Sequence, residues 1–214
     1  MVRFERIVSR LSQGVAVSEA TFDALYPHEL YDLSRTHWTP VPVALEAARM
    51  LVTEPGLRVL DVGSGCGKFC LVAAIASEGI FTGIELRPRL DEEARRAKAL
   101  LWGHTEAMKR VEFFCGEMQA LDWSLFDGFY FYNPFYENLL EDTPREKQVI
   151  DHEIELSSAH YFDLTRVVRR KLEEVKAGTR VVSYHGIGVP LPLGWHRQEK
   201  RSIGSGDLEL WIKR

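Results

Sequence analysis

The chain has 214 residues, of which 45% are hydrophobic and 27% charged, and its formal net charge at pH 7 is −4. These values are ordinary for a globular protein with a substantial core. The negative charge disfavours a general nucleic-acid binder, although it leaves room for a local basic face. The three cysteines, Cys66, Cys70 and Cys115, are too few for a disulfide framework and indicate free thiols in a reducing compartment.

The charged N-terminus predicts no signal peptide, and no apolar run approaches the ~20 residues that a transmembrane helix needs. We therefore expect a cytoplasmic protein without a membrane partner. Cys66 and Cys70 have no nearby Cys or His that would complete a zinc site, so no metal is expected.

The periodicity divides the chain into a helical N-terminal extension, residues 1–40, and a main domain, residues 41–214. In the main domain, helices from Val43, Lys68 and Pro88 (the last to about Met108) and a helix ending at Gly178 are expected. They alternate with five apolar strands, expected at residues 58–63, 81–85, 111–116, 128–133 and 179–186. Such alternation predicts a parallel sheet, because each parallel crossover requires a covering helix.

Two further strands, residues 195–203 and 207–214, flank Gly204-Ser205-Gly206 and predict a closing β-hairpin. The predicted fold is therefore α/β: a doubly wound, mostly parallel seven-stranded sheet with a C-terminal antiparallel hairpin and an N-terminal helical extension.

The segment from Asp61 to Lys68, DVGSGCGK, follows the first strand and opens a helix. A phosphate-binding P-loop is excluded, since only three residues separate Gly63 from the Gly67-Lys68 pair, where four are needed, and Phe69 stands where a hydroxyl is needed. A dinucleotide fingerprint is disfavoured, because G-x-G-x-G is one residue short of G-x-G-x-x-G. A tight turn without a ligand stays open. Twenty residues after Gly65, Glu85 ends the second strand, where an acid can bind a ribose or pair with Arg87 or Arg89.

The loop and Glu85 together resemble class I (Rossmann-like) S-adenosylmethionine (SAM)-dependent methyltransferases. The resemblance implies SAM as cofactor and S-adenosylhomocysteine as product. Asp61 would face the amino group of the methionine moiety, Glu85 the ribose, and Glu117 with Met118 the adenine. The implied cofactor-binding set is Thr39, Asp61, Gly63, Ser64, Gly65, Gly67, Glu85, Leu86, Glu117, Met118 and Asn133.

The fourth strand leads into Asn133, Pro134, Phe135 and Tyr136, which resemble the [DN]-P-P-[YF] signature of nitrogen methyltransferases with Phe135 in place of the second proline. Carbonyl oxygens of Asn133 and Pro134 can accept N–H groups and aim a nitrogen lone pair at the methyl carbon. The four residues are the predicted catalytic set. Together with the element Thr39-Pro40-Val41-Pro42, they also resemble non-SET protein lysine methyltransferases.

These motifs predict a methyltransferase that acts by direct SN2 transfer to nitrogen, on a protein lysine or another amine. A nucleic-acid base is the alternative acceptor, a non-catalytic SAM-binding protein is the alternative of another class, and a nicotinamide-dependent oxidoreductase is disfavoured by the glycine spacing. His185 and Tyr184, at the end of the fifth strand, either touch substrate or form a buried pair. The insert from Glu137 to His160 is expected to be a lid or a substrate wall, and the oligomeric state is left undefined.

Overall fold

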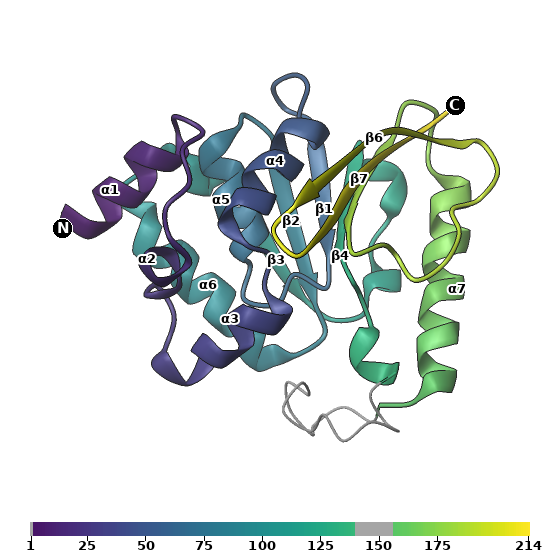
Figure 1. The fold of residues 1–214 in the computed structure, drawn as a ribbon, viewed down its shortest axis with the longest axis horizontal. Coiled ribbons are helices and arrows are strands. Elements are labelled where there is room, and N and C mark those ends of the chain that lie inside the picture. The colour runs from purple at the N-terminus through teal and green to yellow at the C-terminus, as the bar shows by residue number, and fades with distance from the viewer. Residues whose placement is uncertain (1, 140–155) are drawn as a thin grey trace.

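The computed structural model describes residues 2–139 and 156–214, which form a single seven-stranded sheet in the order β3-β2-β1-β4-β5-β7-β6 (Figure 1). Strands β1 to β5 run parallel, whereas β7 is antiparallel to β5 and to β6. The strands are β1 (Arg58–Val62), β2 (Ile80–Glu85), β3 (Val111–Cys115), β4 (Gly128–Tyr132), β5 (Arg180–Tyr184), β6 (Trp195–Ile203) and β7 (Gly206–Lys213). The predicted fold class is confirmed.

The helices connect these strands and cover both faces of the sheet (Figure 1). They are α1 (Val2–Leu11), α2 (Glu19–Asp23), α3 (Tyr31–His37), α4 (Val41–Leu51), α5 (Lys68–Ala76), α6 (Pro88–Trp102) and α7 (Ser158–Glu174). The short 3-10 helices are η1 (His28–Leu30), η2 (Glu106–Arg110), η3 (Met118–Ala120), η4 (Trp123–Leu125) and η5 (Tyr136–Leu139).

The predicted helix from Pro88 to about Met108 was wrong over its last six residues. Helix α6 ends at Trp102 with Gly103 as its C-cap, and the side chain of Thr105 caps the separate turn η2 by accepting from the Ala107 amide. Glycine and threonine are both poor in a helix interior, and threonine competes for backbone amides through its hydroxyl.

Two hydrophobic layers lie on opposite faces of the sheet, and β4 shows how the sequence divides them. Tyr130 points to the face covered by α4 and α5, where it stacks on Phe69 at 3.9 Å between ring centroids. Phe129 and Phe131 point to the α7 face, where Trp123 stacks on Phe129 at 4.8 Å. The alternation follows from the two-residue period of a strand.

The N-terminal helices are attached to the loop between β1 and α5 by a buried ion pair. Lys68 is 2% exposed, and its Nζ lies 2.6 Å from Asp23 Oδ1 and also donates to Glu19. The hydroxyl of Tyr26 donates to the Cys66 carbonyl at 3.0 Å. Segments on both sides of the predicted boundary at residue 40 therefore meet at this loop, and the division itself stays a prediction.

Replacing Lys68 with methionine is expected to lower the free energy of unfolding by about 3 kcal/mol, because the buried carboxylate of Asp23 would lose its cation. The matched control is K109M, since Lys109 pairs with Glu106 on the surface and such pairs contribute less than about 1 kcal/mol. Urea denaturation of both variants measures the difference. Equal effects would contradict the importance assigned to this ion pair.

Candidate active site

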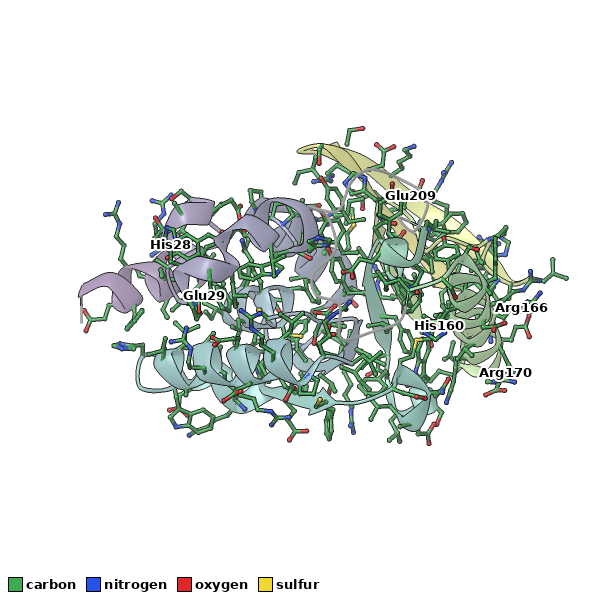
Figure 2. All side chains as sticks on the ribbon, turned by 90° about the horizontal axis from the view of Figure 1, so that it is seen from below. His28, Glu29, His160, Arg166, Arg170 and Glu209 are labelled. Carbon is green, nitrogen blue, oxygen red and sulfur yellow. The ribbon has the colours of Figure 1, made fainter. Side chains whose placement is uncertain are left out.

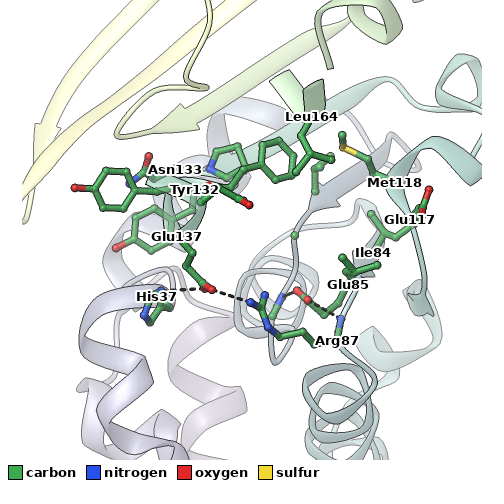
Figure 3. A pocket seen from close by; sticks show the side chains of 18 of the residues that line it. His37, Ile84, Glu85, Arg87, Glu117, Met118, Tyr132, Asn133, Glu137 and Leu164 are labelled. Carbon is green, nitrogen blue, oxygen red and sulfur yellow. Dashed lines mark hydrogen bonds and ion pairs between the residues drawn. The ribbon is translucent and has the colours of Figure 1, made fainter. Parts of the chain in front are cut away.

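A cavity of about 660 Å³ opens at the carboxyl ends of β1, β2, β4 and β5. It lies beside the point where the strand order reverses between β1 and β4, which is the usual ligand position in doubly wound sheets. Glu117 and Met118 lie on one side of this cavity, and Tyr132 and Asn133 on the other (Figure 3).

The glycine loop presents bare backbone to the cavity at two positions. Gly63 and Gly65 have φ angles of 78° and 53°, both line the cavity, and a Cβ built on either would meet nothing within 4 Å. Gly67 differs, because its Cβ would overlap the ring of Phe113 and lie 2.9 Å from the Cβ of Ala94. The first two glycines leave room for a ligand, whereas the third allows α5 and β3 to pack closely.

Glu85 reaches the cavity from the end of β2 and also holds the glycine loop. Its Oε2 accepts from the Gly65 amide and its Oε1 from the Arg87 amide, each at 2.9 Å. Burial raises the pKa of this carboxyl above its usual value, and the two amides oppose that shift. The guanidinium of Arg87 pairs with Glu137 at 2.7 Å. Glu85 therefore offers remaining lone pairs to a ligand in a partly desolvated position.

Asp61 lies below the glycine loop, on the α5 side of β1, and does not line the cavity. It is 4% exposed, and its Oδ2 accepts from the Cys70 thiol at 3.5 Å. Burial raises the pKa of Asp61 to about 8, with a further contribution from the charge of Glu85, although the bond from Cys70 opposes it. Any influence on a ligand must pass through the loop backbone.

Two other members of the predicted cofactor set point away from the cavity. Thr39 is 5% exposed, and its Oγ1 lies 3.1 Å from the hydroxyl of Tyr130. The side chain of Ser64 packs over Gly83, whose missing Cβ leaves the space it needs. Four residues of the predicted set therefore lie behind the cavity wall and do not line it: Thr39, Asp61, Ser64 and Gly67. The predicted residues that line it are Gly63, Gly65, Glu85, Leu86, Glu117, Met118, Asn133, Pro134, Phe135 and Tyr136.

The loop after β4 has an unusual backbone. Asn133 and Phe135 have φ angles of 39° and 67°. Proline is fixed near −65°, so the second proline of the [DN]-P-P-[YF] signature could not occupy position 135 in this conformation. Asparagine tolerates the left-handed region better than most residues. The amide of Asn133 donates to the Tyr184 carbonyl at 3.1 Å, which fixes the loop to the end of β5.

Glu137 connects three segments across the opening of the cavity. It pairs with Arg87 at 2.7 Å and lies 3.8 Å from Nδ1 of His37, as Figure 3 shows. His37 and its neighbour Trp38 bring the N-terminal region into the cavity wall. No sequence pattern predicts that His37 and Arg87 approach Glu137, since the three segments are far apart in the chain.

Helix α7 forms another wall, of which the predicted lid or substrate wall, Glu137 to His160, included only His160. The residues of α7 that line the cavity share one helical face: His160, Asp163, Leu164 and Val167. Their i, i+3, i+4, i+7 spacing is a signal that could have identified them. Arg166 and Arg170 project outward from α7 in Figure 2, as expected for a solvated face. The part of the predicted lid from 140 to 155 lies outside the described residues.

Known structures resemble this architecture. TrmN from Thermus thermophilus aligns with a TM-score of 0.58 at 18% identity, over 86% of this chain and 52% of that one. An RNA methyltransferase from Salinibacter ruber in complex with S-adenosyl-L-homocysteine aligns with a TM-score of 0.53 at 21% identity, over 82% of this chain and 92% of that one. The chain has the class I methyltransferase fold.

MtNAS, solved in complex with MTA and tNA, aligns over 100% of this chain and 71% of its own length, with a TM-score of 0.55 at 14% identity. The chain spans about half the length of TrmN, 52%. No protein-family model and no curated protein matches the sequence. These likenesses establish the fold.

Within residues 2–139 and 156–214, no group of three or more His, Cys, Asp or Glu side chains is arranged to hold a metal ion. No helix in those ranges is long and apolar enough to cross a membrane.

Replacing Asp61 with asparagine is expected to alter how stability depends on pH. The folded-state pKa of about 8 exceeds the unfolded value of about 3.9, so the folded state holds the proton more tightly. Asp61 therefore lowers the free energy of unfolding as pH rises from about 4 through about 8. D61N removes this loss, and its stability relative to wild type should increase by roughly 2 kcal/mol between about pH 6 and pH 9. Denaturant titrations at both pH values measure the difference in the free energy of unfolding between D61N and wild type. A difference that does not change with pH would contradict the raised pKa of Asp61.

Proposed function

We propose that the protein is a SAM-dependent methyltransferase that transfers methyl by direct SN2 displacement to an amine nitrogen, with a protein lysine as the favoured acceptor. One observation carries the proposal: a single cavity is lined by Gly63 and Gly65, by Glu85, and by Asn133 and Pro134. The first three suit the cofactor, and the last two suit a nitrogen that bears N–H groups.

The cofactor end fits SAM in shape and chemistry. Gly63 and Gly65 would admit the amino-acid portion against the backbone, and Glu85 can accept from both ribose hydroxyls. Met118, which is 7% exposed, and Glu117 line the side where adenine would lie. When bound, SAM supplies a methyl group carried on a sulfonium and leaves as S-adenosylhomocysteine.

Charge on the cavity wall favours an amine over a phosphate-bearing acceptor. Among the described residues that line the cavity, four carry carboxylates. The guanidinium of Arg87 also lines it and is paired with one of these carboxylates, that of Glu137. The carboxylates belong to Glu85, Glu117, Glu137 and Asp163. An acidic wall attracts a cationic acceptor and repels a phosphodiester. The apolar residues Phe135, Leu164 and Val167 desolvate the acceptor nitrogen and so favour its neutral form.

A nucleic-acid base is the second candidate acceptor, because the similar Salinibacter ruber protein is an RNA methyltransferase. The aromatic rings of Tyr132 and Phe135 in the cavity wall could stack on a base. Assays on separate protein and RNA fractions distinguish the two acceptors.

Glu85 is the decisive residue for the cofactor. Wild type is expected to bind S-adenosylhomocysteine in calorimetry, and E85Q to bind it roughly 10- to 100-fold more weakly, since charge-assisted bonds to the ribose would be lost. E112Q is the matched control, because Glu112 is exposed on β3 outside the cavity. The proposal fails if wild type releases no heat of binding.

Asn133 is the decisive residue for methyl transfer. N133G removes the side-chain carboxamide, and glycine adopts φ 39° without strain. The change therefore isolates the effect of the side chain. Turnover of labelled SAM on cell-extract protein should fall by roughly 100-fold through misorientation of the acceptor. N133D keeps an accepting oxygen at the same place and should retain more activity than N133G. Full turnover by N133G would remove Asn133 from the catalytic set. Wild type that binds the cofactor but labels neither protein nor RNA would favour a non-catalytic SAM-binding protein.

A further inference from the structure

Backbone strain is concentrated at one end of the cavity. In the described parts of the chain, the non-glycine residues with positive φ are Asn133, Phe135 and His185, and each of them lines this cavity. A left-handed conformation is unfavourable for a residue with a Cβ, and it persists where the surroundings impose it, often at functional sites. Asn133 and its loop belong to the acceptor end, so the strain at His185 points to the same region.

His185 follows the last residue of β5, and a backbone hydrogen bond between β5 and the loop after β4 brings it close to Asn133. The Asn133 amide donates to the carbonyl of Tyr184, the residue before His185, at 3.1 Å. The imidazole stacks on Tyr132 with 5.8 Å between ring centroids and lies 4.3 Å from the ring of Tyr184. The residue is exposed at the cavity wall, where an acceptor could reach it.

The β6–β7 turn leaves space for this ring. A Cβ on Gly206 would overlap Cε1 of His185 and lie 2.6 Å from Nδ1 and 2.7 Å from Nε2. The turn is fixed to β5, because the Tyr184 hydroxyl donates to the Ile203 carbonyl at 2.8 Å and accepts from the Ser205 amide at 3.1 Å. A strained backbone and a bare glycine, on different strands, therefore hold the imidazole at the acceptor end.

Groups on three strands face the imidazole. They are Tyr132 on β4, Tyr184 on β5 and Asp207 on β7, whose carboxylate interacts electrostatically with His185. Asp207 is itself held by Lys200 at 2.8 Å and by the Ser202 hydroxyl at 2.7 Å. No like charge among these groups opposes a cation formed on the ring.

We propose that His185 is a catalytic residue that binds the acceptor nitrogen and takes its proton, an inference that rests on the proposed amine methyl transfer. One N–H bond of the acceptor ammonium breaks, its electron pair stays on the nitrogen, and the proton bonds to an imidazole nitrogen to give the imidazolium. The lone pair so released is the nucleophile that the Asn133 and Pro134 carbonyls orient. Histidine suits this step because its protonation changes between about pH 5 and pH 8. The proton returns to water after transfer.

The test requires no knowledge of the natural acceptor. The probes are S-adenosylhomocysteine and two analogues in which nitrogen replaces the sulfur and carries either an aminoethyl or a propyl arm. The propyl analogue matches the other in length and in its central nitrogen, so the comparison isolates the terminal amine. In wild type at about pH 8, we expect the amine arm to improve affinity about tenfold over the propyl arm, or about 1.4 kcal/mol. At a lower pH that protonates the imidazole, the advantage should shrink, because imidazolium and ammonium repel.

Three variants separate catalysis from structure. H185N, in a residue type that tolerates positive φ, should bind S-adenosylhomocysteine like wild type and lose the amine advantage at both pH values. G206A should also lose the preference for the amine arm, since the added methyl group displaces the His185 ring. H185G should also lose it, while relief of strain raises the melting temperature.

Each outcome is decisive. Wild type that fails to bind S-adenosylhomocysteine removes the proposed function, and the inference with it. Wild type that binds it without preferring the amine arm, or H185N that keeps the full preference, overturns the inference alone. H185G with a lowered melting temperature would show that His185 supports the fold instead of the acceptor.

Discussion

The hydrogen bond from the Gly65 amide to the Glu85 carboxylate joins the two elements that are proposed to bind the cofactor into one unit. The amides of Gly63 and Ser64 add bonds to the Ile84 carbonyl at 3.0 and 2.9 Å, so the loop after β1 is fixed to the end of β2. Because the loop has no side chains to fill its concave side, this attachment to β2 sets its shape. The carboxylate that would bind the ribose is thus also the group that shapes the loop for the rest of the ligand.

The other end of the loop depends on the N-terminal region. Lys68 begins α5, and the buried carboxylate of Asp23 neutralises it there. The same N-terminal region supplies His37 and Trp38 to the cavity wall, and His37 approaches Glu137. A segment that looks like an appendage in the sequence therefore contributes to the loop and to the opening of the site. Its ion pair lies behind the cavity, where it leaves the interior free for a ligand.

Sequence periodicity located the strand ends, and through them Glu85 and Asn133, because parallel strands place their carboxyl ends at one edge of the sheet. It could not say which way Thr39 and Ser64 point, since that depends on packing against Tyr130 and Gly83. For Asp61 the information was present: a strand alternates, so Asp61 shares the α5 face with Val59. The residue spacing on α7 marks one face of that helix, but the cavity that this face and α3 line depends on contacts between distant segments, which a single sequence does not define.

The two ends of the cavity are built by different means, and the chemistry explains why. A cofactor that arrives already activated needs a receptor of fixed shape, and backbone amides and glycines provide one. The proposed amine acceptor would have to be bound as a cation, made neutral and aimed, and acidic walls with inward-directed side chains suit these steps. The chain leaves β4 and β5 through left-handed residues, Asn133 and His185, whereas Glu85 reaches the cavity directly from the end of β2. Strain at Asn133 and His185 costs stability, and the stacked aromatic core beneath, Phe69 on Tyr130 and Trp123 on Phe129, contributes stability that offsets it.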